Sequence, residues 1–206
     1  ATKAPLLSIV PVTFDKDLRW LKYSLRSRKK YCEGYHDDII ILDDHEDDCV
    51  ASKAYLESKK HKFVVNTQAK LIKIGYVRQQ YMKFFCDEYV DEKTTHIVHV
   101  DSDSIFTEPH DPSIYFKDGK PIMLMTPYSE FFAEGQPENV KSALKVWQDV
   151  TSLALNEKVE YEFMRRMPLV YPIEIHKEMR DFFEKTHGKP IFEYLYDVCE
   201  MAAPHN

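Results

Sequence analysis

The fold of this chain is indicated most clearly by the stretch HIVHVDSD, residues 96–103. Residues 96–100 form a short, mostly apolar run, which is too short for a helix and predicts a buried strand. Two carboxylates, Asp101 and Asp103, follow where the chain leaves this strand. Aspartates at positions i and i+2 of a strand end can turn toward one cation. The stretch therefore predicts a buried strand that ends in paired oxygen ligands.

Three earlier runs are also continuous rather than alternating in their apolar residues: 6–12, 38–43 and 62–66. Apolar residues at helical spacing predict helices over 15–31 and 76–89, and a further helix is expected over 46–59. These segments alternate with the apolar runs, including the one at 96–100. Continuous apolar strands that alternate with helices are typical of a largely parallel sheet with both faces covered. We therefore predict an α/β, Rossmann-like fold with a mostly parallel central sheet flanked by helices.

The second half of the chain is richer in predicted helix. Its apolar patterns predict helices over 140–156 and 174–187, a fifth strand over 122–125 and a short strand within 167–172. Gly188 and Pro190 follow the second of these helices, as is usual where a helix stops. Because the chain shows no internal repeat and no credible linker, we expect one domain spanning residues 1–206.

The charge composition argues against a nucleic-acid-binding protein. The net charge is −6, whereas a nucleic-acid-binding domain usually carries a basic face, so no nucleic-acid partner is expected. A basic stretch, residues 16–30, precedes an acidic stretch, residues 37–48. Both are interpreted as solvated faces, or the first as a helix that meets an anionic acceptor or a membrane surface.

The sequence also bears on the cellular compartment. No run approaches the roughly 18 apolar residues that a membrane span needs, so no membrane span is expected. The four cysteines stand far apart and form no C-x-x-C pair, which favours reduced thiols over a disulfide or zinc framework. We therefore expect a soluble, cytoplasmic protein.

Ligands of open parallel sheets bind beyond the carboxyl ends of the strands, so the loops that follow the predicted strands carry the candidate site. These loops are residues 11–14, 43–45 and 101–104. Carboxylates such as Asp101 and Asp103 suit Mg²⁺ or Mn²⁺, which can bridge a diphosphate. The alternative for this pair is two solvated aspartates that cap a turn.

Residues 75–84, followed by residues 96–106, resemble the helix and D-S-D strand of GT-A type glycosyltransferases. Several bacterial and viral members share this arrangement, and small virus-encoded transferases such as those of chlorella viruses are similar in size. The resemblance covers residues 6–128 and fades beyond them. It implies a GT-A fold with a nucleotide-sugar-binding half, residues 1–107, and an acceptor-side half, residues 108–206. For a viral member, the compartment would be the host cytoplasm.

The resemblance also implies roles for particular residues. Arg78 would reach the sugar or diphosphate of the donor, Asp101 would face the ribose and sugar, and Asp103 would be the direct metal ligand. The residues implied in nucleotide-sugar binding are Pro11, Val12, Thr13, Asp43, Asp44, Arg78, Lys83, Asp101 and Ser102. Those implied in binding Mn²⁺ or Mg²⁺ are Asp101, Asp103 and His187.

The acceptor side is less defined. His187 begins a run, His187-Gly188-Lys189-Pro190, that resembles a histidine-containing element of one retaining group but is compressed and lacks its tryptophan. His176 and His205 are alternatives for the same metal role. Glu193 and Asp197 are the candidate catalytic bases, with Glu200, Glu130 and Glu134 as further candidates; Arg165 and Arg166 are candidates for pairing with the diphosphate.

These observations predict a metal-dependent glycosyltransferase. It would move a sugar from a UDP- or GDP-sugar to a hydroxyl of a carbohydrate or glycoprotein acceptor. Two alternatives stay open. One is a haloacid-dehalogenase-like phosphatase, in which Asp101 would be the nucleophile. The other is a catalytically inactive nucleotide-sugar-binding module.

Overall fold

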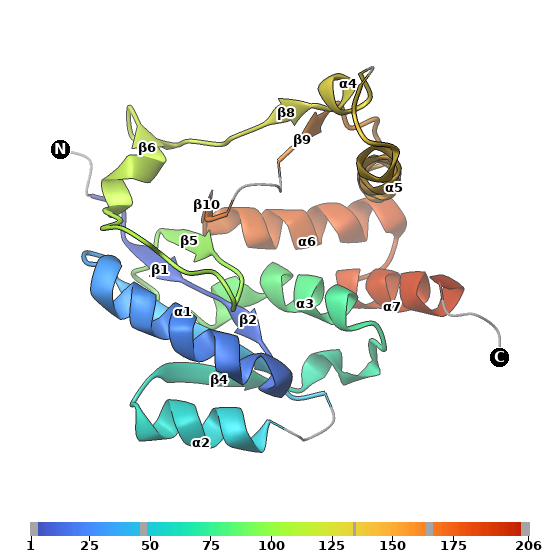
Figure 1. Cartoon of the computed structure of the whole chain (residues 1–206). Coiled ribbons are helices and arrows are strands. Elements are labelled where there is room, and N and C mark those ends of the chain that lie inside the picture. Colours follow the sequence, from blue (N-terminus) through green and yellow to red (C-terminus); the bar gives the residue numbers. More distant parts are fainter. Residues whose placement is uncertain (1–3, 46–48, 134, 164–166, 203–206) are drawn as a thin grey trace.

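The computed structural model of this chain describes residues 4–45, 49–133, 135–163 and 167–202 (Figure 1). Its main sheet has six strands. From one edge to the other, these are β10 (Leu169–Pro172), β5 (His96–His99), β1 (Leu7–Ile9) and β3 (Asp37–Asp43), and β3 also pairs with β2 (Val12–Thr13) and β4 (Lys62–Asn66). All pairings in this sheet are parallel except that of β10 with β5. The predicted mixed α/β, Rossmann-like sheet is confirmed.

The strands β1 and β2 are two segments of one strand line. Ile9 lies opposite Asp38, and Val12 lies opposite Ile41, so both segments pair with β3 in the same register. Pro11 lies between them and has no amide hydrogen to donate, but its carbonyl accepts a hydrogen bond from Ile41 N at 2.9 Å. The proline therefore interrupts the ladder without changing the direction of the strand.

The order of the parallel strands reverses direction between β1 and β5. The chain passes from β1 to β3 to β4 on one side, and then returns to place β5 on the other side of β1. Such a switch point leaves a crevice at the carboxyl ends of the two central strands, because their connecting loops turn away in opposite directions. A parallel bridge between Val12 and Asp101 holds these two ends together.

Helices cover both faces of the sheet (Figure 1). On one face, α1 (Leu18–Tyr31) and α2 (Val50–Ser58) bury Leu21, Leu25 and Leu56 against alternate residues of β3. On the other face lies α3 (Gly75–Phe84), which packs with α7 (Ile191–Ala202) and α6 (Glu174–His187). The helix predicted over 174–187 has these same bounds, whereas α7 was not predicted.

Short elements complete the chain between β5 and β10. They are η4 (Pro112–Tyr115), β6 (Phe116–Lys117), β7 (Lys120–Pro121), β8 (Thr126–Pro127), α4 (Tyr128–Phe131), α5 (Glu138–Leu155) and β9 (Tyr161–Glu162). The remaining 3₁₀ turns are η1 (Asp15–Asp17), η2 (Gln68–Leu71) and η3 (Cys86–Glu88). The helix predicted over 76–89 ends at Phe84 and continues only as the η3 turn.

The fifth strand predicted over 122–125 is wrong. This segment links β7 to β8 without strand pairing, and its four side chains are 43–56% exposed. An apolar run forms a buried strand only where it pairs with a neighbouring strand and another layer covers it. Residues 122–125 lie away from the main sheet and, within the described part of the chain, have neither. The outward face of α5 is similarly uncovered, with Trp147 and Leu153 exposed.

Among the described residues, no helix is both long and apolar enough to cross a membrane. The four cysteines, Cys32, Cys49, Cys86 and Cys199, are all free thiols, as the sequence predicted. Three of them are buried, so they belong to the packed interior rather than to the surface.

Candidate functional site

The candidate site is built at the carboxyl edge of the main sheet, around the switch point between β1 and β5. The strand line of β2 ends at Thr13, β3 ends at Asp43, and the line of β5 continues to Asp101. Most of the residues predicted to bind a nucleotide sugar therefore lie at the carboxyl ends of adjacent strands or directly beyond them. Their convergence is a consequence of parallel topology, because parallel strands present all their carboxyl ends at one edge.

Four side chains, Asp17, Asp101, Ser102 and Asp103, form a group that we call the acidic edge. The hydroxyl of buried Ser102 donates a hydrogen bond to Asp17 Oδ2 at 3.2 Å, which ties the β5 loop to the start of α1. Burial and repulsion from Asp103 raise the pKa of Asp17 above its ordinary value, although the Ser102 hydrogen bond acts in the opposite direction. Several negative charges thus gather within electrostatic reach at the end of β5.

The acidic edge is flanked by α3. Lys83 Nζ lies 3.2 Å from Asp101 Oδ1, and its side chain is mostly buried while that of Asp101 is 41% exposed. Tyr76, at the start of the same helix, is near enough that burial and the Asp101 carboxylate raise its pKa. Asp103 is exposed and makes no hydrogen bond or ion pair with any residue in the described part of the chain. Its carboxylate is therefore available to a ligand.

Arg78 and Asp43, both predicted to contact the donor, contact each other. Arg78 Nε donates to Asp43 Oδ2 at 2.9 Å, and Nη1 donates to the carbonyls of Ile72 and Lys73, each at 2.9 Å. Both side chains are about nine-tenths buried. In this arrangement the arginine joins α3, the preceding loop and the end of β3. It supports the site from beneath rather than presenting its guanidinium to solvent.

Asp44 is held in a similar way. It accepts hydrogen bonds from Lys53 Nζ at 2.6 Å and from the Cys49 amide at 3.1 Å. Burial on its own would raise the pKa of Asp44, but the lysine and the amide outweigh it, and the pKa lies below its ordinary value. Thr13 Oγ1 is buried and has no hydrogen-bond partner among the described residues, so it is an unsatisfied polar group of this edge.

The acidic edge fits a hard divalent cation in its chemistry. Asp101 and Asp103 provide carboxylate oxygens, the ligands that Mg²⁺ and Mn²⁺ prefer. Mg²⁺ commonly takes one or two carboxylates from the protein and completes its shell with substrate phosphates and water. The acidic edge does not form a closed cage of three or more protein ligands: within the described ranges, the group that brings three potential ligand atoms within 4.8 Å of one another is Cys86, His99 and His176.

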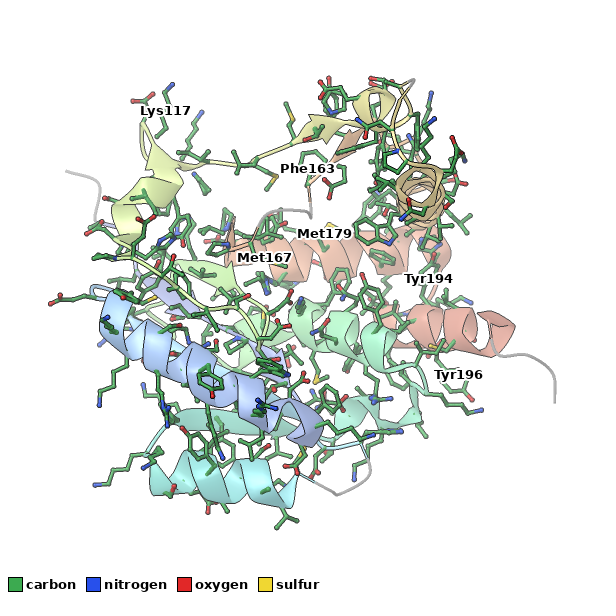
Figure 2. The ribbon with its side chains drawn as sticks, viewed as in Figure 1. Lys117, Phe163, Met167, Met179, Tyr194 and Tyr196 are labelled. Atoms are coloured by element: carbon green, nitrogen blue, oxygen red, sulfur yellow. The ribbon has the colours of Figure 1, made fainter. Side chains whose placement is uncertain are left out.

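His187 is not near the acidic edge. It ends α6, about 16 Å along the helix from His176, which contacts β5. Its Nε2 donates to the carbonyl of Ala154 at 2.8 Å, and its ring centroid lies 4.3 Å from that of Tyr194. Figure 2 labels Tyr194, which lies on α7. The structure therefore places His187 in the packing between α5, α6 and α7, and no described contact joins it to the acidic edge. Its metal role stays a prediction.

The candidate bases are dispersed. Asp197 pairs with Lys189 at 2.6 Å, at the start of α7, and Glu193 is exposed on the same helix. Glu130 is exposed on α4. Glu134, Arg165, Arg166 and His205 lie outside the described residues, as does the side chain of Glu200. Among the described residues, none of these candidates contacts the acidic edge.

Two residues at or beside the acidic edge were not predicted from the sequence. Asp17 has the pattern of a favourable residue at a helix start, and Tyr76 that of an ordinary helix residue. A usable signal exists for Asp17, because it lies four residues after the end of the first strand line and therefore at the same edge of the sheet. No signal marks Tyr76, since its approach to Asp101 depends on how α3 packs.

Comparisons with known proteins do not assign the chain to a family. No family model matches it, and no curated protein matches it. Among solved structures, one that matches is 4-diphosphocytidyl-2C-methyl-D-erythritol synthase from Anaerococcus prevotii, with 11% identity and a TM-score of 0.47. The match covers 95% of this chain and 83% of that chain. At this identity and TM-score, the likeness assigns no activity to this chain.

Proposed function

We propose that this protein is a metal-dependent glycosyltransferase of the GT-A type, which transfers a sugar from a UDP- or GDP-sugar to a hydroxyl acceptor. The observation that carries the proposal is the position of Asp101 and Asp103 at the switch point of a parallel sheet, beside the end of β2. Ligands of such sheets bind at this point, and the free Asp103 carboxylate is the group best able to hold a cation there.

The neighbouring residues support this proposal by their chemistry. Lys83 places a cation beside Asp101, where it can shift to a donor diphosphate. The Arg78–Asp43 pair fixes the loop after β3, and a bound nucleoside would lie beside this loop. A divalent cation, when held by Asp103, supplies positive charge that favours departure of the nucleotide diphosphate. The acceptor hydroxyl would attack the anomeric carbon, and no described carboxylate is assigned as its base.

The first test is nucleotide binding. Thermal unfolding would be followed with UDP, GDP and their sugar conjugates, each with and without Mn²⁺. A ligand selective for the folded state raises the melting temperature, so one nucleotide should do so only when Mn²⁺ is present. A chain that no nucleotide stabilises under either condition would contradict the proposal.

The second test is the Asp103→Asn variant. Loss of the cation removes several kcal/mol of transition-state stabilisation, so metal-dependent hydrolysis of the donor should fall at least about 100-fold. The matched control is Asp149→Asn, which removes an exposed carboxylate on α5 and should leave the rate unchanged. Full activity in Asp103→Asn, with the fold intact by circular dichroism, would refute the metal role.

The same assays separate the alternatives. A phosphatase would form a phospho-aspartate on Asp101, which can be trapped with borohydride and located by mass spectrometry. A binding module without activity would show Mn²⁺-dependent stabilisation by a nucleotide but no release of sugar. Either result would replace the glycosyltransferase proposal while leaving the location of the site unchanged.

A further inference from the structure

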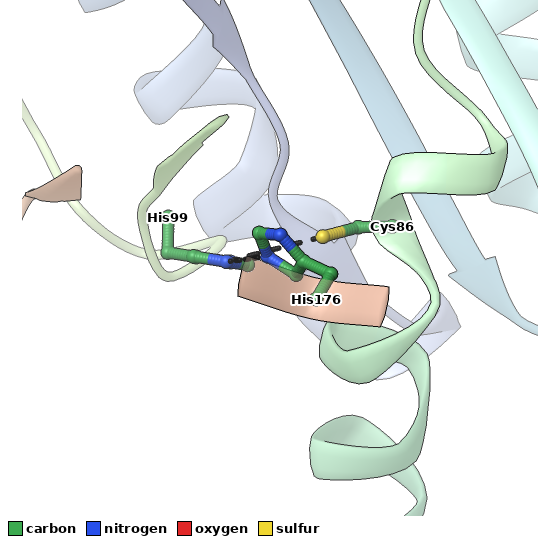
Figure 3. Close-up of side chains that lie close together, drawn as sticks. All are labelled: Cys86, His99 and His176. Atoms are coloured by element: carbon green, nitrogen blue, oxygen red, sulfur yellow. Dashed lines mark hydrogen bonds between the residues drawn. The ribbon is translucent and has the colours of Figure 1, made fainter. Parts of the chain in front are cut away.

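A second group of potential metal ligands lies in the interior, where β5 ends. Cys86, His99 and His176 are all buried, with exposed fractions of 0%, 6% and 5%. Cys86 Sγ is 3.9 Å from His99 Nε2, and His99 Nε2 is 3.0 Å from His176 Nε2 (Figure 3). These three residues, which we call the Cys-His-His cluster, come from η3, β5 and α6. Three separate elements thus aim their ligand atoms at one point.

The hydrogen bonds of His176 orient its ring toward that point. His176 Nδ1 lies 3.1 Å from the carbonyl of Ile173, and because a carbonyl only accepts, Nδ1 carries the proton. In the neutral ring, the Nε2 lone pair is directed at His99 Nε2, from which it accepts a hydrogen bond at 3.0 Å. A backbone carbonyl that fixes the tautomer in this way is the usual outer support of a metal-bound histidine.

His99 can adopt the matching form. In the structure, His99 Nε2 donates the 3.0 Å hydrogen bond to His176 Nε2, while its Nδ1 is buried and has no hydrogen-bond partner among the described residues. To bind a metal through Nε2, His99 must carry its proton on Nδ1 instead. Both rings are then neutral nitrogen donors, the form in which histidine binds metals.

We propose that the Cys-His-His cluster binds a transition-metal ion, with Zn²⁺ as the ion that it fits best. One thiolate and two imidazoles are typical zinc ligands and are poor ligands for Mg²⁺ or Ca²⁺. Tetrahedral zinc with ordinary Zn–N and Zn–S bonds separates its ligand atoms by about 3.3–3.6 Å. The observed 3.0 and 3.9 Å bracket this range, so side-chain shifts of a few tenths of an ångström would complete these two contacts.

Metal binding must remove a proton from Cys86. In the structure its thiol donates to the carbonyl of Lys83 at 3.0 Å, and burial raises the pKa of the thiol well above its ordinary value. The balanced step is that Cys86–SH and Zn²⁺ form a Zn–thiolate bond and release one proton to solvent. The three protein ligands leave a fourth position for water or another small ligand.

The consequence for the molecule is mechanical. A metal here would join α6 and the η3 turn to β5. Of its ligands, His99 and His176 are 77 positions apart in the sequence. His99 lies two residues before Asp101, and Cys86 lies three residues after Lys83. The cluster would therefore steady both partners of the Lys83–Asp101 pair. Metal binding at the cluster does not depend on the proposed transferase activity.

The decisive experiment uses the unmodified chain and Co²⁺, a coloured substitute for Zn²⁺. After treatment with EDTA and desalting, Co²⁺ would be titrated while the absorption spectrum is recorded. We expect one equivalent to produce thiolate-to-cobalt charge-transfer absorption in the near ultraviolet, and one equivalent of Zn²⁺ to abolish it. Because oxygen ligands give no such band, binding at the acidic edge cannot imitate it. Absence of the band from the folded, unmodified chain would by itself overturn the proposal.

Variants then assign the ligands. Cys86→Ser should eliminate the band, and His176→Gln should weaken Zn²⁺ binding at least about 100-fold, since even loss of an outer-shell partner typically costs 10–100-fold. The matched control is Cys199→Ser, which alters another buried thiol but should keep the band. Asp103→Asn should also keep it. Retention of the band in Cys86→Ser, or its loss in Cys199→Ser, would overturn the assignment.

Discussion

Two groups of potential metal ligands lie at the end of β5 and differ in the properties that govern metal choice. The acidic edge offers carboxylates, with Asp103 open to solvent and Asp101 partly so. The Cys-His-His cluster offers sulfur and nitrogen atoms in the interior. Hard cations that keep water and phosphate ligands suit the first group, whereas zinc-like ions suit the second.

The two groups are close in sequence, and they differ in burial because helices cover one of them and not the other. His99 and Asp101 are two positions apart on one strand line, so alternation directs both toward the same face of the sheet. His99 is covered there by η3 and α6, while Asp101 lies beyond the covering helices. Burial, rather than position in the strand, therefore decides which chemistry each of these residues can perform.

The largest expected effect is on the free energy of unfolding, and it tests how much the support of the acidic edge contributes to stability. Arg78→Met would leave Asp43 buried without its partner, and loss of one member of a buried pair destabilises a protein by about 3–5 kcal/mol. Urea denaturation would measure this loss. Arg26→Met, on the exposed face of α1, is the control and should change stability by less than about 0.5 kcal/mol. A small loss of stability together with a large loss of nucleotide affinity would instead make Arg78 a direct ligand.

A slightly smaller loss of stability is expected from a change to a residue that supports both groups of ligands. Met82 is fully buried on α3, directly before Lys83 in the sequence, and it belongs to the same buried cluster as Cys86. Met82→Ala should cost about 2–5 kcal/mol through the lost contacts and the remaining cavity. It should weaken Zn²⁺ and nucleotide binding alike. Met123→Ala, which shortens an exposed methionine, is the control for calorimetry. If only one of the two binding activities weakened, α3 would not be their common support.

A pH-dependent effect on stability is expected from Asp44, on the edge side. The folded-state pKa of Asp44 is depressed, so its ion pair contributes stability above the unfolded-state pKa of about 4, and this contribution disappears as the pH falls through the folded value. Asp44→Asn should therefore be less stable than the parent chain at pH 7, and the difference should shrink below about pH 4. Melting temperatures between pH 3 and 7 would show this, with Asp181→Asn, on the surface of α6, as the control. A difference independent of pH would assign the effect to packing.

The smallest expected effect concerns the link between the two groups. Lys83 neutralises Asp101, and because that carboxylate is partly exposed, the pair is worth about 1 kcal/mol or less. Lys83→Gln should tighten Mn²⁺ binding by up to about fivefold, because the cation no longer competes with the lysine. In the same variant, affinity for a nucleotide diphosphate should fall. Calorimetric titrations would compare it with Lys145→Gln on α5. Weaker Mn²⁺ binding in Lys83→Gln would contradict competition at Asp101.

Much of the sheet half could be predicted from the sequence, because its strands are continuous apolar runs with strong helices between them. Residues 62–66 form β4 with the predicted bounds, and the run at 38–43 differs from β3 by one residue. The run at 122–125 failed because hydrophobicity predicts burial only when a partner strand is present, and none is paired with it. The helix α7 was not predicted, because it follows the helix stop at Gly188 and Pro190 without a capping residue of its own.

The sequence by itself determined that an apolar strand would end in Asp101-Ser102-Asp103 at the carboxyl edge of a parallel sheet, since local pattern and topology rules suffice for that. Only the tertiary structure decided that Arg78 would pair with Asp43, that Asp17 would join the edge, and that His187 would pack between α5 and α7. It alone brought Cys86 and His176 to His99, because contacts between residues far apart in the chain depend on how helices pack and leave no periodic trace in the sequence.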